Sequence, residues 1–219
     1  GKPLFRERKV ETHIVEKGAY SNLIDDVDAF LQKNMHFSNR RQFFSCPAAI
    51  LRILNQIQTD DEKLFQLLNQ IQLDMPNSGP KQEKLLDIIN QLAARNDITK
   101  TVIFTHWHPT FHHMHDILQG SEFSAFYINP NFDDKQASDV RARFSQCEGY
   151  AVLLVTDRMS EGVDLEMANS IINIDLPYNP AKLQQRIGRL DRYIQESEFI
   201  EIHNLVLKDS LEQRQVEVL

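Results

Sequence analysis

Three arginines recur at helical spacing in the last part of the sequence: Arg186, Arg189 and Arg192. A guanidinium group stays charged and bonds two phosphate oxygens at once, so such a row can bind phosphate or stabilise charge during phosphoryl transfer. Pro180 suits the first turn of a helix that would carry them. Gly188 costs about 1 kcal/mol relative to alanine inside a helix, which indicates that another group approaches its backbone. On spacing alone, an exposed basic helix face is the simpler interpretation.

A second polar segment follows the apolar run Leu153–Val155 and contains Glu161, Gly162 and Asp164. A flexible glycine beside two carboxylates can form a polar loop. Taken alone, these residues are typical of an ordinary turn. Their order gives them more weight, because the loop, a further apolar run and the segment Asp175–Pro180 all precede the arginine helix.

Short apolar runs alternate with helical patterns after residue 80, which predicts βαβ units and a mostly parallel sheet covered on both faces. The expected strands are Thr101–Thr105, Phe123–Tyr127, Tyr150–Val155, Ile171–Asp175 and Phe199–Val206. Ligands of such sheets gather at the carboxyl ends of the strands. The segments Thr105–His108, Thr156–Asp164 and Asp175–Pro180 are therefore expected to meet at one edge.

The first part of the sequence has a different pattern, and the segment Asp74–Pro80 separates the two parts because its prolines and glycine interrupt any helix. A short strand is expected at Val10–Val15. Helices are expected over Tyr20–Gln32, Pro47–Gln58 and Glu62–Leu73. We therefore expect a mainly helical appendage over residues 1–77 and an α/β lobe over residues 78–219.

The arginine helix resembles motif VI of superfamily-two helicases, and Leu153–Leu165 resembles their motif V. Val102–Trp107 looks like motif IV of the Swi/Snf branch, and Asp175–Pro180 resembles the Asp-x-x-Trp-Asn-Pro of that branch. The resemblance runs from about residue 80 onward. More loosely, Arg40–Leu54 is similar to the helical protrusion of the bacterial RNA-polymerase-recycling branch. The resemblance to superfamily-two helicases implies a P-loop NTPase fold. Within that fold, this chain would be the second RecA-like lobe, a parallel sheet flanked by helices.

The resemblance also assigns roles to residues. It implies that Arg189 and Arg192 are arginine fingers that reach the γ-phosphate of ATP held by a partner lobe. The residues implied in nucleotide contact are Gln185, Gly162, Glu161 and Asp164. Those implied in nucleic-acid contact are Thr105, Trp107, Thr156, Ser160 and Lys182.

The phosphate loop Gly-x-x-x-x-Gly-Lys-Ser/Thr and the Asp-Glu-x-His motif are both missing from the sequence. We therefore expect no ATP hydrolysis by this chain alone, with ATP and Mg²⁺ bound mainly by an N-terminal lobe of the same polypeptide. The expected substrate is double-stranded DNA, with a DNA-bound protein such as RNA polymerase as a further partner. The alternatives are an RNA-directed helicase lobe and a noncatalytic RecA-like adaptor.

Composition limits the remaining possibilities. The net charge of −7 excludes a uniformly basic surface, so contacts with nucleic acid must be local. The apolar runs are far shorter than the roughly 20 residues of a membrane span, and Cys46 and Cys147 fit unpaired thiols of a cytoplasmic protein. His108 and His112 share a helical spacing, but no cysteine or HExxH pattern accompanies them, so we expect no metal site.

Overall fold

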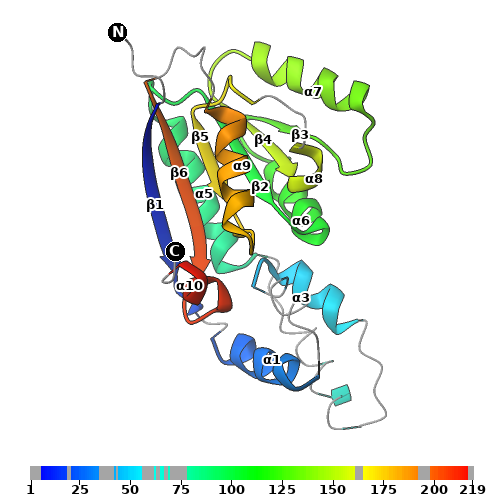
Figure 1. Cartoon of the computed structure of the whole chain (residues 1–219). Helices are drawn as coiled ribbons and strands as arrows, with labels where there is room; N and C mark the ends of the chain where they lie inside the picture. Colours follow the sequence, from blue (N-terminus) through cyan, green and yellow to red (C-terminus); the bar gives the residue numbers. More distant parts are fainter. Residues whose placement is uncertain are drawn as a thin grey trace.

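A six-stranded parallel sheet forms the centre of the molecule, in the order β1-β6-β5-β2-β4-β3 (Figure 1). This computed structural model describes residues 6–18, 21–34, 42, 44–55, 62, 65, 66, 69, 78–160, 165–191 and 198–216. The strands are β1 (Glu7–Val15), β2 (Lys100–Thr105), β3 (Ser124–Tyr127), β4 (Ala151–Thr156), β5 (Ser170–Asn173) and β6 (Phe199–Leu207). Each strand predicted after residue 80 is present, with bounds shifted by no more than two residues. The predicted α/β class is confirmed.

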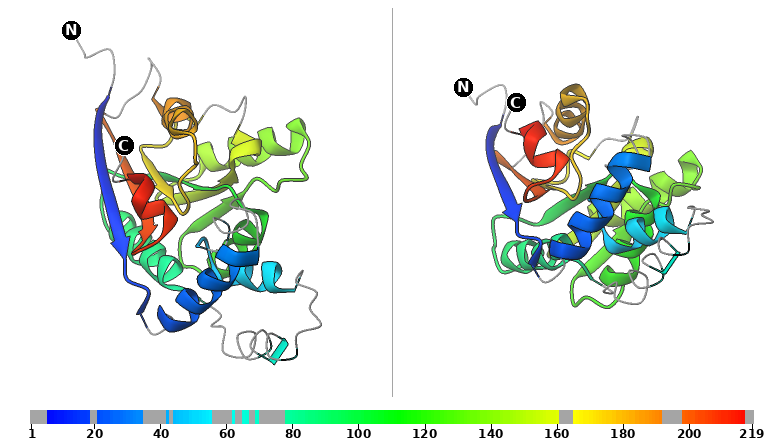
Figure 2. Two further views of the ribbon diagram at one scale, coloured as in Figure 1. Left: turned by 60° about the horizontal axis from the view of Figure 1, so that its bottom comes forward. Right: turned by 90° about the horizontal axis from the view of Figure 1, so that it is seen from below.

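The helices cover both faces of this sheet and one of its edges. They are α1 (Ser21–Asn34), α3 (Pro47–Leu54), α5 (Pro80–Ala93), α6 (His108–Leu118), α7 (Asp134–Gln146), α8 (Asp157–Ser160), α9 (Pro180–Leu190) and α10 (Leu211–Val216). Figure 2, which views the molecule from below, places α1 and α3 across the edge at which the strands end. The helix predicted at Glu62–Leu73 lies largely outside the described residues.

Two apolar clusters hold these layers together. On one face, Val140 and Phe144 of α7 and Ile187 of α9 pack on the sheet. On the other face, Leu85 of α5 and Phe111 of α6 do the same. Because helices cover both faces, β2 and β4 are buried along their full length, which explains their nearly continuous apolar sequences. Among the described residues, no helix is both long enough and apolar enough to cross a bilayer.

The helices that border the carboxyl edge begin at residues suited to capping. Asn179 precedes α9 and its side chain accepts a hydrogen bond from the backbone N–H of Ala181 at 2.9 Å. Gly79 precedes α5, where a Cβ atom would lie 2.7 Å from Oε1 of Gln82 and 2.9 Å from Cδ of Pro47. Glycine is required there by this close approach, which also packs the start of α3 against the start of α5.

Strand β1 corrects the predicted domain division. It pairs with β6 over its whole length, from Glu7 opposite Phe199 to Val15 opposite Leu207. The segment before residue 78 therefore contributes an edge strand to the sheet, and it is not wholly a separate helical appendage. A pairing partner almost two hundred residues away leaves no local signal in the sequence, so the pattern at Val10–Val15 predicted the strand but not its place.

A buried ion pair joins α5 to α10. The ammonium group of Lys81 donates to Oε2 of Glu212 at 2.5 Å and to the carbonyl oxygen of Ile174 at 2.8 Å. Only 2% of the Lys81 side chain and 1% of the Glu212 side chain are exposed. Removing one partner of such a pair leaves an uncompensated buried charge, whereas apolar replacement of both partners avoids that penalty.

We expect Lys81→Met to lower the free energy of unfolding by about 3–5 kcal/mol, because the carboxylate of Glu212 would stay buried without its partner. The double variant Lys81→Met, Glu212→Leu should lose much less. Urea denaturation of both variants measures the difference, with Lys135→Met on the exposed face of α7 as the control. Equal losses in the single and double variants would contradict this account.

Candidate nucleotide and nucleic-acid site

The three segments predicted to meet at the carboxyl edge are in contact. His106, which follows β2, donates its backbone N–H to Oδ1 of Asp175 at 2.7 Å. Nδ1 of the same histidine lies 2.9 Å from Oδ2 of Asp157, the residue that follows β4. The ends of β2 and β4 and the segment after β5 thus form one polar cluster, as the rule for parallel sheets predicts.

Arg186 lies at the centre of this cluster. Its guanidinium donates to both carboxylate oxygens of Asp157, from Nε at 2.6 Å and from one terminal nitrogen at 2.9 Å. The other terminal nitrogen donates to the side chain of Asn173 at 2.8 Å and to the backbone carbonyl oxygen of Asp175 at 2.9 Å. The ring of Phe104 lies 5.2 Å below the guanidinium carbon. Arg186 therefore links α9 to β4, β5 and the loop after β5.

The burial of Arg186 corrects the prediction of an arginine row that projects in one direction. Arg186 is only 2% exposed, whereas Arg189 is half-buried at the helix surface. A hydrophobic period alone cannot distinguish an arginine that anchors a helix from one that faces solvent. The nearby carboxylate Asp157 was the available signal, since a buried arginine needs such a partner.

Asp157 stays ionised because of its partners. Burial alone would raise the pKa of this carboxyl, but the hydrogen bonds from His106 and Arg186 outweigh burial and hold its pKa well below the ordinary range. The carboxylate is thus ionised near neutral pH and keeps the guanidinium in place. Asp157 was not among the predicted site residues.

Asp175 fixes the end of β2. Its carboxylate accepts hydrogen bonds from the Thr105 hydroxyl at 2.6 Å and from the Ser45 hydroxyl at 2.9 Å, besides that from the backbone of His106. Ser45 lies just before α3 and is also 2.7 Å from the hydroxyl of Thr110. The segment before residue 78 is therefore tied to the site through a residue that the sequence pattern did not single out.

The burial of Thr105 and Thr156 corrects their predicted contact with nucleic acid. Thr105 is fully buried and its hydroxyl is used by Asp175. Thr156 is 2% exposed, and its hydroxyl has no hydrogen-bond partner among the described residues. Neither side chain reaches the surface, so Thr105 positions Asp175 and Thr156 forms part of a pocket floor.

An open pocket of about 480 Å³ lies above these residues. Its lining residues are Gln42, Arg52, His106, Trp107, His108, Pro109, Thr156, Asp157, Arg158 and Lys182. Arg52, Arg158 and Lys182 are exposed, and Trp107 is half-buried with the ring of His106 edge-on at 4.7 Å. The pocket thus combines exposed cations with an aromatic ring, which are the groups that bind a nucleic-acid backbone and its bases.

The outward face of α9 carries the remaining predicted residues that the structure describes. Gln185 and Gly188 are exposed, and no heavy atom lies within 4 Å of a Cβ built on Gly188. Among the described residues, none therefore makes the close approach that this glycine indicated. One helix thus carries the amide of Gln185, the exposed backbone of Gly188 and the guanidinium of Arg189. These groups suit the binding of a phosphate chain that another lobe holds.

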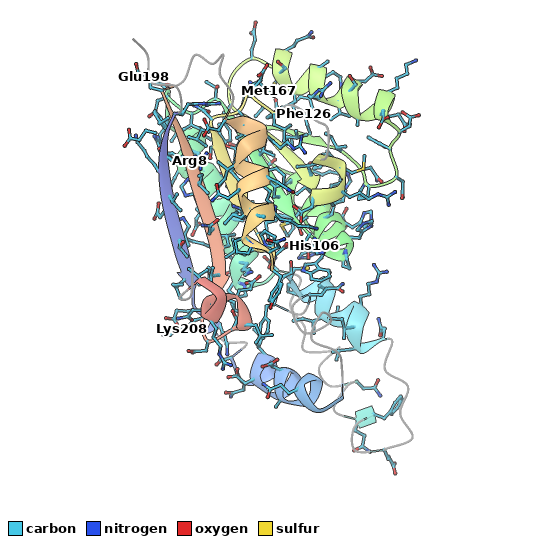
Figure 3. The ribbon with its side chains drawn as sticks, viewed as in Figure 1. Arg8, His106, Phe126, Met167, Glu198 and Lys208 are labelled. Carbon is cyan, nitrogen blue, oxygen red and sulfur yellow. The ribbon has the colours of Figure 1, made fainter. Side chains whose placement is uncertain are left out.

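The C-terminal end of α9 is held by β1. Arg8 donates to Oδ2 of Asp191 from Nε at 3.1 Å and from a terminal nitrogen at 2.8 Å, and Arg6 donates to the carbonyl oxygen of Leu190 at 2.6 Å. Figure 3 shows Arg8 on β1 and His106 near the opposite, first end of α9. This clamp was not predicted, because β1 was expected to belong to the appendage.

Several predicted site residues lie outside the described residues. They are Arg192, Glu161, Gly162 and Asp164, together with the side chain of Ser160, whose backbone ends α8. Their predicted roles therefore remain predictions.

Comparisons with known proteins agree with this geometry. The family model described as "Helicase conserved C-terminal domain" matches residues 80–194. The ATP-dependent helicase YqhH of Bacillus subtilis is 26% identical over 227 residues, which cover 98% of this chain and 40% of that protein. The RNA polymerase-associated protein RapA of Vibrio campbellii is 47% identical over 70 residues, which cover 32% of this chain and 7% of that protein. The chain thus spans less than half the length of these curated relatives.

A solved structure confirms the fold. The C-terminal part of the Fun30 ATPase domain superposes with a TM-score of 0.72 and 13% sequence identity, over 97% of this chain and 89% of that one. Identity at this level shows a shared fold alone. The predicted RecA-like lobe, a parallel sheet flanked by helices, is therefore confirmed.

We expect Arg186→Ala to lower the free energy of unfolding by about 3–5 kcal/mol, because it removes one partner of a buried ion pair. Arg189→Ala, on the same helix, should change it by only ~0.5 kcal/mol. The contribution of the pair should be complete above the ordinary aspartate pKa of about 3.9 and should fall as the pH drops toward the lower pKa of folded Asp157.

Urea denaturation of the parent and both variants at pH values of about 3 to 7 measures these effects, because this range crosses the ordinary aspartate pKa of about 3.9. A parent-like stability for Arg186→Ala, or an equal loss in both variants, would show that the buried cluster is not the anchor of α9.

Proposed function

The chain belongs to the family of helicase conserved C-terminal domains, and from that premise we propose that it is the second motor lobe of a Swi/Snf-type, ATP-driven translocase on double-stranded DNA. The arrangement of α9 carries this proposal. Arg186 anchors the helix from inside, Lys182 lines the basic pocket, and Arg189 lies one to two turns further along on the accessible surface. One helix thus offers cations to two different ligands.

In this proposal, Arg189 and Arg192 reach the γ-phosphate of ATP across the cleft between two lobes. A guanidinium stabilises the charge that develops on the transferred phosphoryl group without taking part in covalent chemistry. Gln185, Glu161, Gly162 and Asp164 complete the nucleotide contacts from this side. ATP and Mg²⁺ are bound mainly by the other lobe, so this chain by itself is inactive.

The clamp between Arg8 and Asp191 supports a finger role for the neighbouring Arg189. The Asp191 side chain is 2% exposed and accepts two hydrogen bonds from Arg8, which fixes the backbone directly after Arg189. Catalysis by positioning requires the reactive geometry to be held closely, and a helix end with free rotation would not do so.

The nucleic acid is proposed to lie along the basic pocket, in contact with Trp107, Ser160 and Lys182. The net charge of −7 requires any contact with nucleic acid to be local. Arg52, Arg158 and Lys182 supply such a local positive charge. Burial lowers the pKa of His108, and the nearby groups His112, Arg52 and Arg158 lower it further, in keeping with a positive potential there.

The similarity to RapA, although limited to 70 residues, supports RNA polymerase as a further partner, because that relative is described as RNA polymerase-associated. The choice of duplex DNA rests on the resemblance of Val102–Trp107 and Asp175–Pro180 to the Swi/Snf branch. A cytoplasmic location follows from the same proposal and suits the two free cysteines, Cys46 and Cys147. An RNA-directed lobe and a noncatalytic adaptor are the alternatives that the experiments below separate.

We expect Arg189→Ala or Arg192→Ala in the complete two-lobed protein to slow ATP hydrolysis by about 10³-fold or more, because a finger acts mainly on the transition state. Melting temperatures should stay close to that of the parent. The control is Arg143→Ala on the exposed face of α7, which should leave the rate unchanged. If both finger variants hydrolyse ATP at the parent rate with DNA present, the finger assignment fails and the adaptor becomes the better account.

We expect Lys182→Ala and Arg158→Ala to weaken stimulation by DNA while leaving basal hydrolysis intact, since both residues line the basic pocket. Each lost phosphate contact should reduce the slope of log affinity against log salt by about 0.9. Lys135→Ala, an exposed lysine in the first turn of α7 that does not line the pocket, is the matched control. Stimulation by duplex RNA or single strands in place of duplex DNA would favour the RNA-directed alternative.

A further inference from the structure

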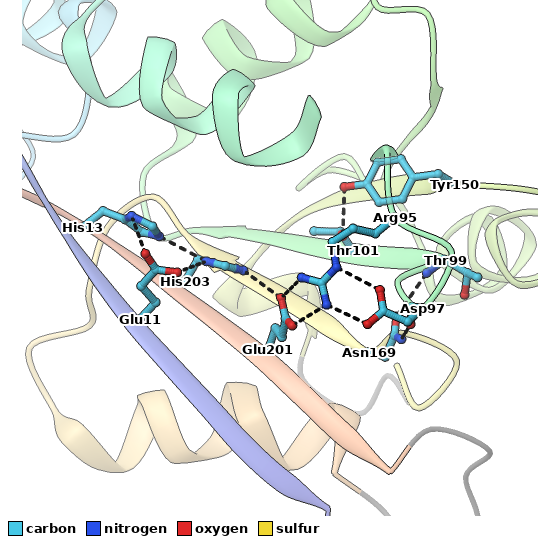
Figure 4. Close-up of polar contacts among 10 residues, drawn as sticks. All are labelled: Glu11, His13, Arg95, Asp97, Thr99, Thr101, Tyr150, Asn169, Glu201 and His203. Atoms are coloured by element: carbon cyan, nitrogen blue, oxygen red, sulfur yellow. Dashed lines mark hydrogen bonds and ion pairs between the residues drawn. The ribbon is translucent and has the colours of Figure 1, made fainter. Parts of the chain in front are cut away.

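A second polar cluster lies on the opposite face of the sheet, on the strands β1 and β6. Glu11 and His13 are two residues apart on β1 and therefore point to the same face, and Glu11 is the register partner of His203 on β6. Figure 4 shows the three side chains converging. Each offers one ligand atom, and these atoms all lie within 4.8 Å of one another. None of these three residues takes part in the ATP and nucleic-acid contacts proposed above.

The distances in this cluster match those of a metal site. Nε2 of His13 lies 3.1 Å from Nδ1 of His203, and that Nδ1 lies 3.7 Å from Oε2 of Glu11. Nitrogen and oxygen ligands bound tetrahedrally at 2.0–2.2 Å from Zn²⁺ are about 3.3–3.5 Å apart. Small side-chain adjustments would therefore bring all three atoms onto one ion, in place of the single proton that the two imidazoles now share.

The surroundings of His203 supply an outer shell. A metal-bound histidine usually gives its other ring N–H to a carboxylate, which fixes the tautomer. His203 is 7% exposed, and its Nε2 has no hydrogen-bond partner within the described part of the chain, although Oε2 of Glu201 lies 3.6 Å from that nitrogen. Glu201 is itself held by two hydrogen bonds from Arg95, at 2.8 and 2.7 Å (Figure 4). A carboxylate is thus already fixed on the side of the ring that faces away from the proposed ion.

The cluster is open to an ion from solution. It lines a pocket of about 480 Å³ between β1, β6 and α5, and Glu11 is exposed at its rim. The carboxylates Glu11 and Glu201 offset the cations Lys9 and Arg95 that share the pocket. Room remains for water as a fourth ligand. Two imidazoles and one carboxylate form a donor set that suits a divalent transition metal better than Mg²⁺ or Ca²⁺, which prefer oxygen ligands.

We propose that Glu11, His13 and His203 bind one divalent transition metal ion, with Zn²⁺ the best fit, and that the ion fastens the edge strand β1 to β6. The strand alternates, so the ion would act on one face while Arg8 holds Asp191 on the other. Metal binding would thereby stabilise the strand that carries the clamp on α9. This proposal does not rest on the activity proposed for the lobe.

Isothermal titration of the 219-residue chain with Zn²⁺ tests it, followed by visible absorption of the Co²⁺ form to report the donor geometry. We expect one equivalent of Zn²⁺ to bind and to raise the melting temperature. His13→Ala and the near-isosteric Glu11→Gln should each weaken binding by at least about 10-fold, and Glu201→Gln by about 10–100-fold through the outer shell. His112→Ala, an exposed histidine on α6, is the matched control and should bind as the parent does.

Failure of the parent chain to bind one equivalent would overturn the proposal, as would equal loss in His112→Ala and His13→Ala. If His13→Ala does not fold, Glu11→Gln decides, because Glu11 is exposed and its amide keeps the shape of the carboxylate. Unchanged affinity in Glu11→Gln together with unchanged affinity in Glu201→Gln would reduce the cluster to a hydrogen bond between two histidines.

Discussion

The buried charge of Arg186 is the interaction on which the carboxyl edge of the sheet depends. It is shared among Asp157, Asn173 and the carbonyl oxygen of Asp175, so one side chain joins α9 to the ends of two strands. Desolvating a guanidinium costs several kcal/mol, and only such complete pairing offsets that cost. Asp157 and Asp175 then orient the residues after β2, which makes the loops of the site extensions of one network rather than independent segments.

The same anchor determines which residues of α9 are available to ligands. A helix turns about 100° per residue, so fixing Arg186 toward the sheet leaves Gln185 on the accessible side and Arg189 at the flank. Lys182 lies on nearly the same side of the helix as Arg186, but it is exposed in the first turn, where it lines the basic pocket. The motif is therefore better understood as an inward anchor with outward contacts on either side. A second constraint on the helix comes from Arg8 of β1 and from Arg6 just before it, which hold its opposite end at Asp191 and Leu190.

Local patterns were sufficient to predict most elements of the lobe. The strands β2 and β4 are short and rich in apolar and β-branched residues, and the start of α9 is marked by Asn179 and Pro180, so each could be recognised without knowledge of its neighbours. Their meeting at one edge followed from the geometry of parallel sheets.

What could not be predicted depends on contacts between distant parts of the chain. The inward direction of Arg186, the role of Ser45 and the register of β1 against β6 each require the partner to be known. The paired sequences Glu11-Thr12-His13 and Glu201-Ile202-His203 show the same limit. Each is unremarkable alone, and the cluster exists only because the two strands lie side by side in that register.

The pairing of β1 with β6 also has a consequence for how the chain is made. On the ribosome, β1 emerges before its ladder partner β6, which follows only after about 190 more residues. During that interval Val10 and Ile14, which are exposed even in the finished sheet, have no strand beside them. This segment also carries the charged residues Glu7, Arg8, Lys9 and Glu11, and charged side chains on an edge strand disfavour pairing with strands of other chains. Synthesis of β6 is thus the event that closes the sheet, and chaperone protection of the N-terminal segment matters most before it.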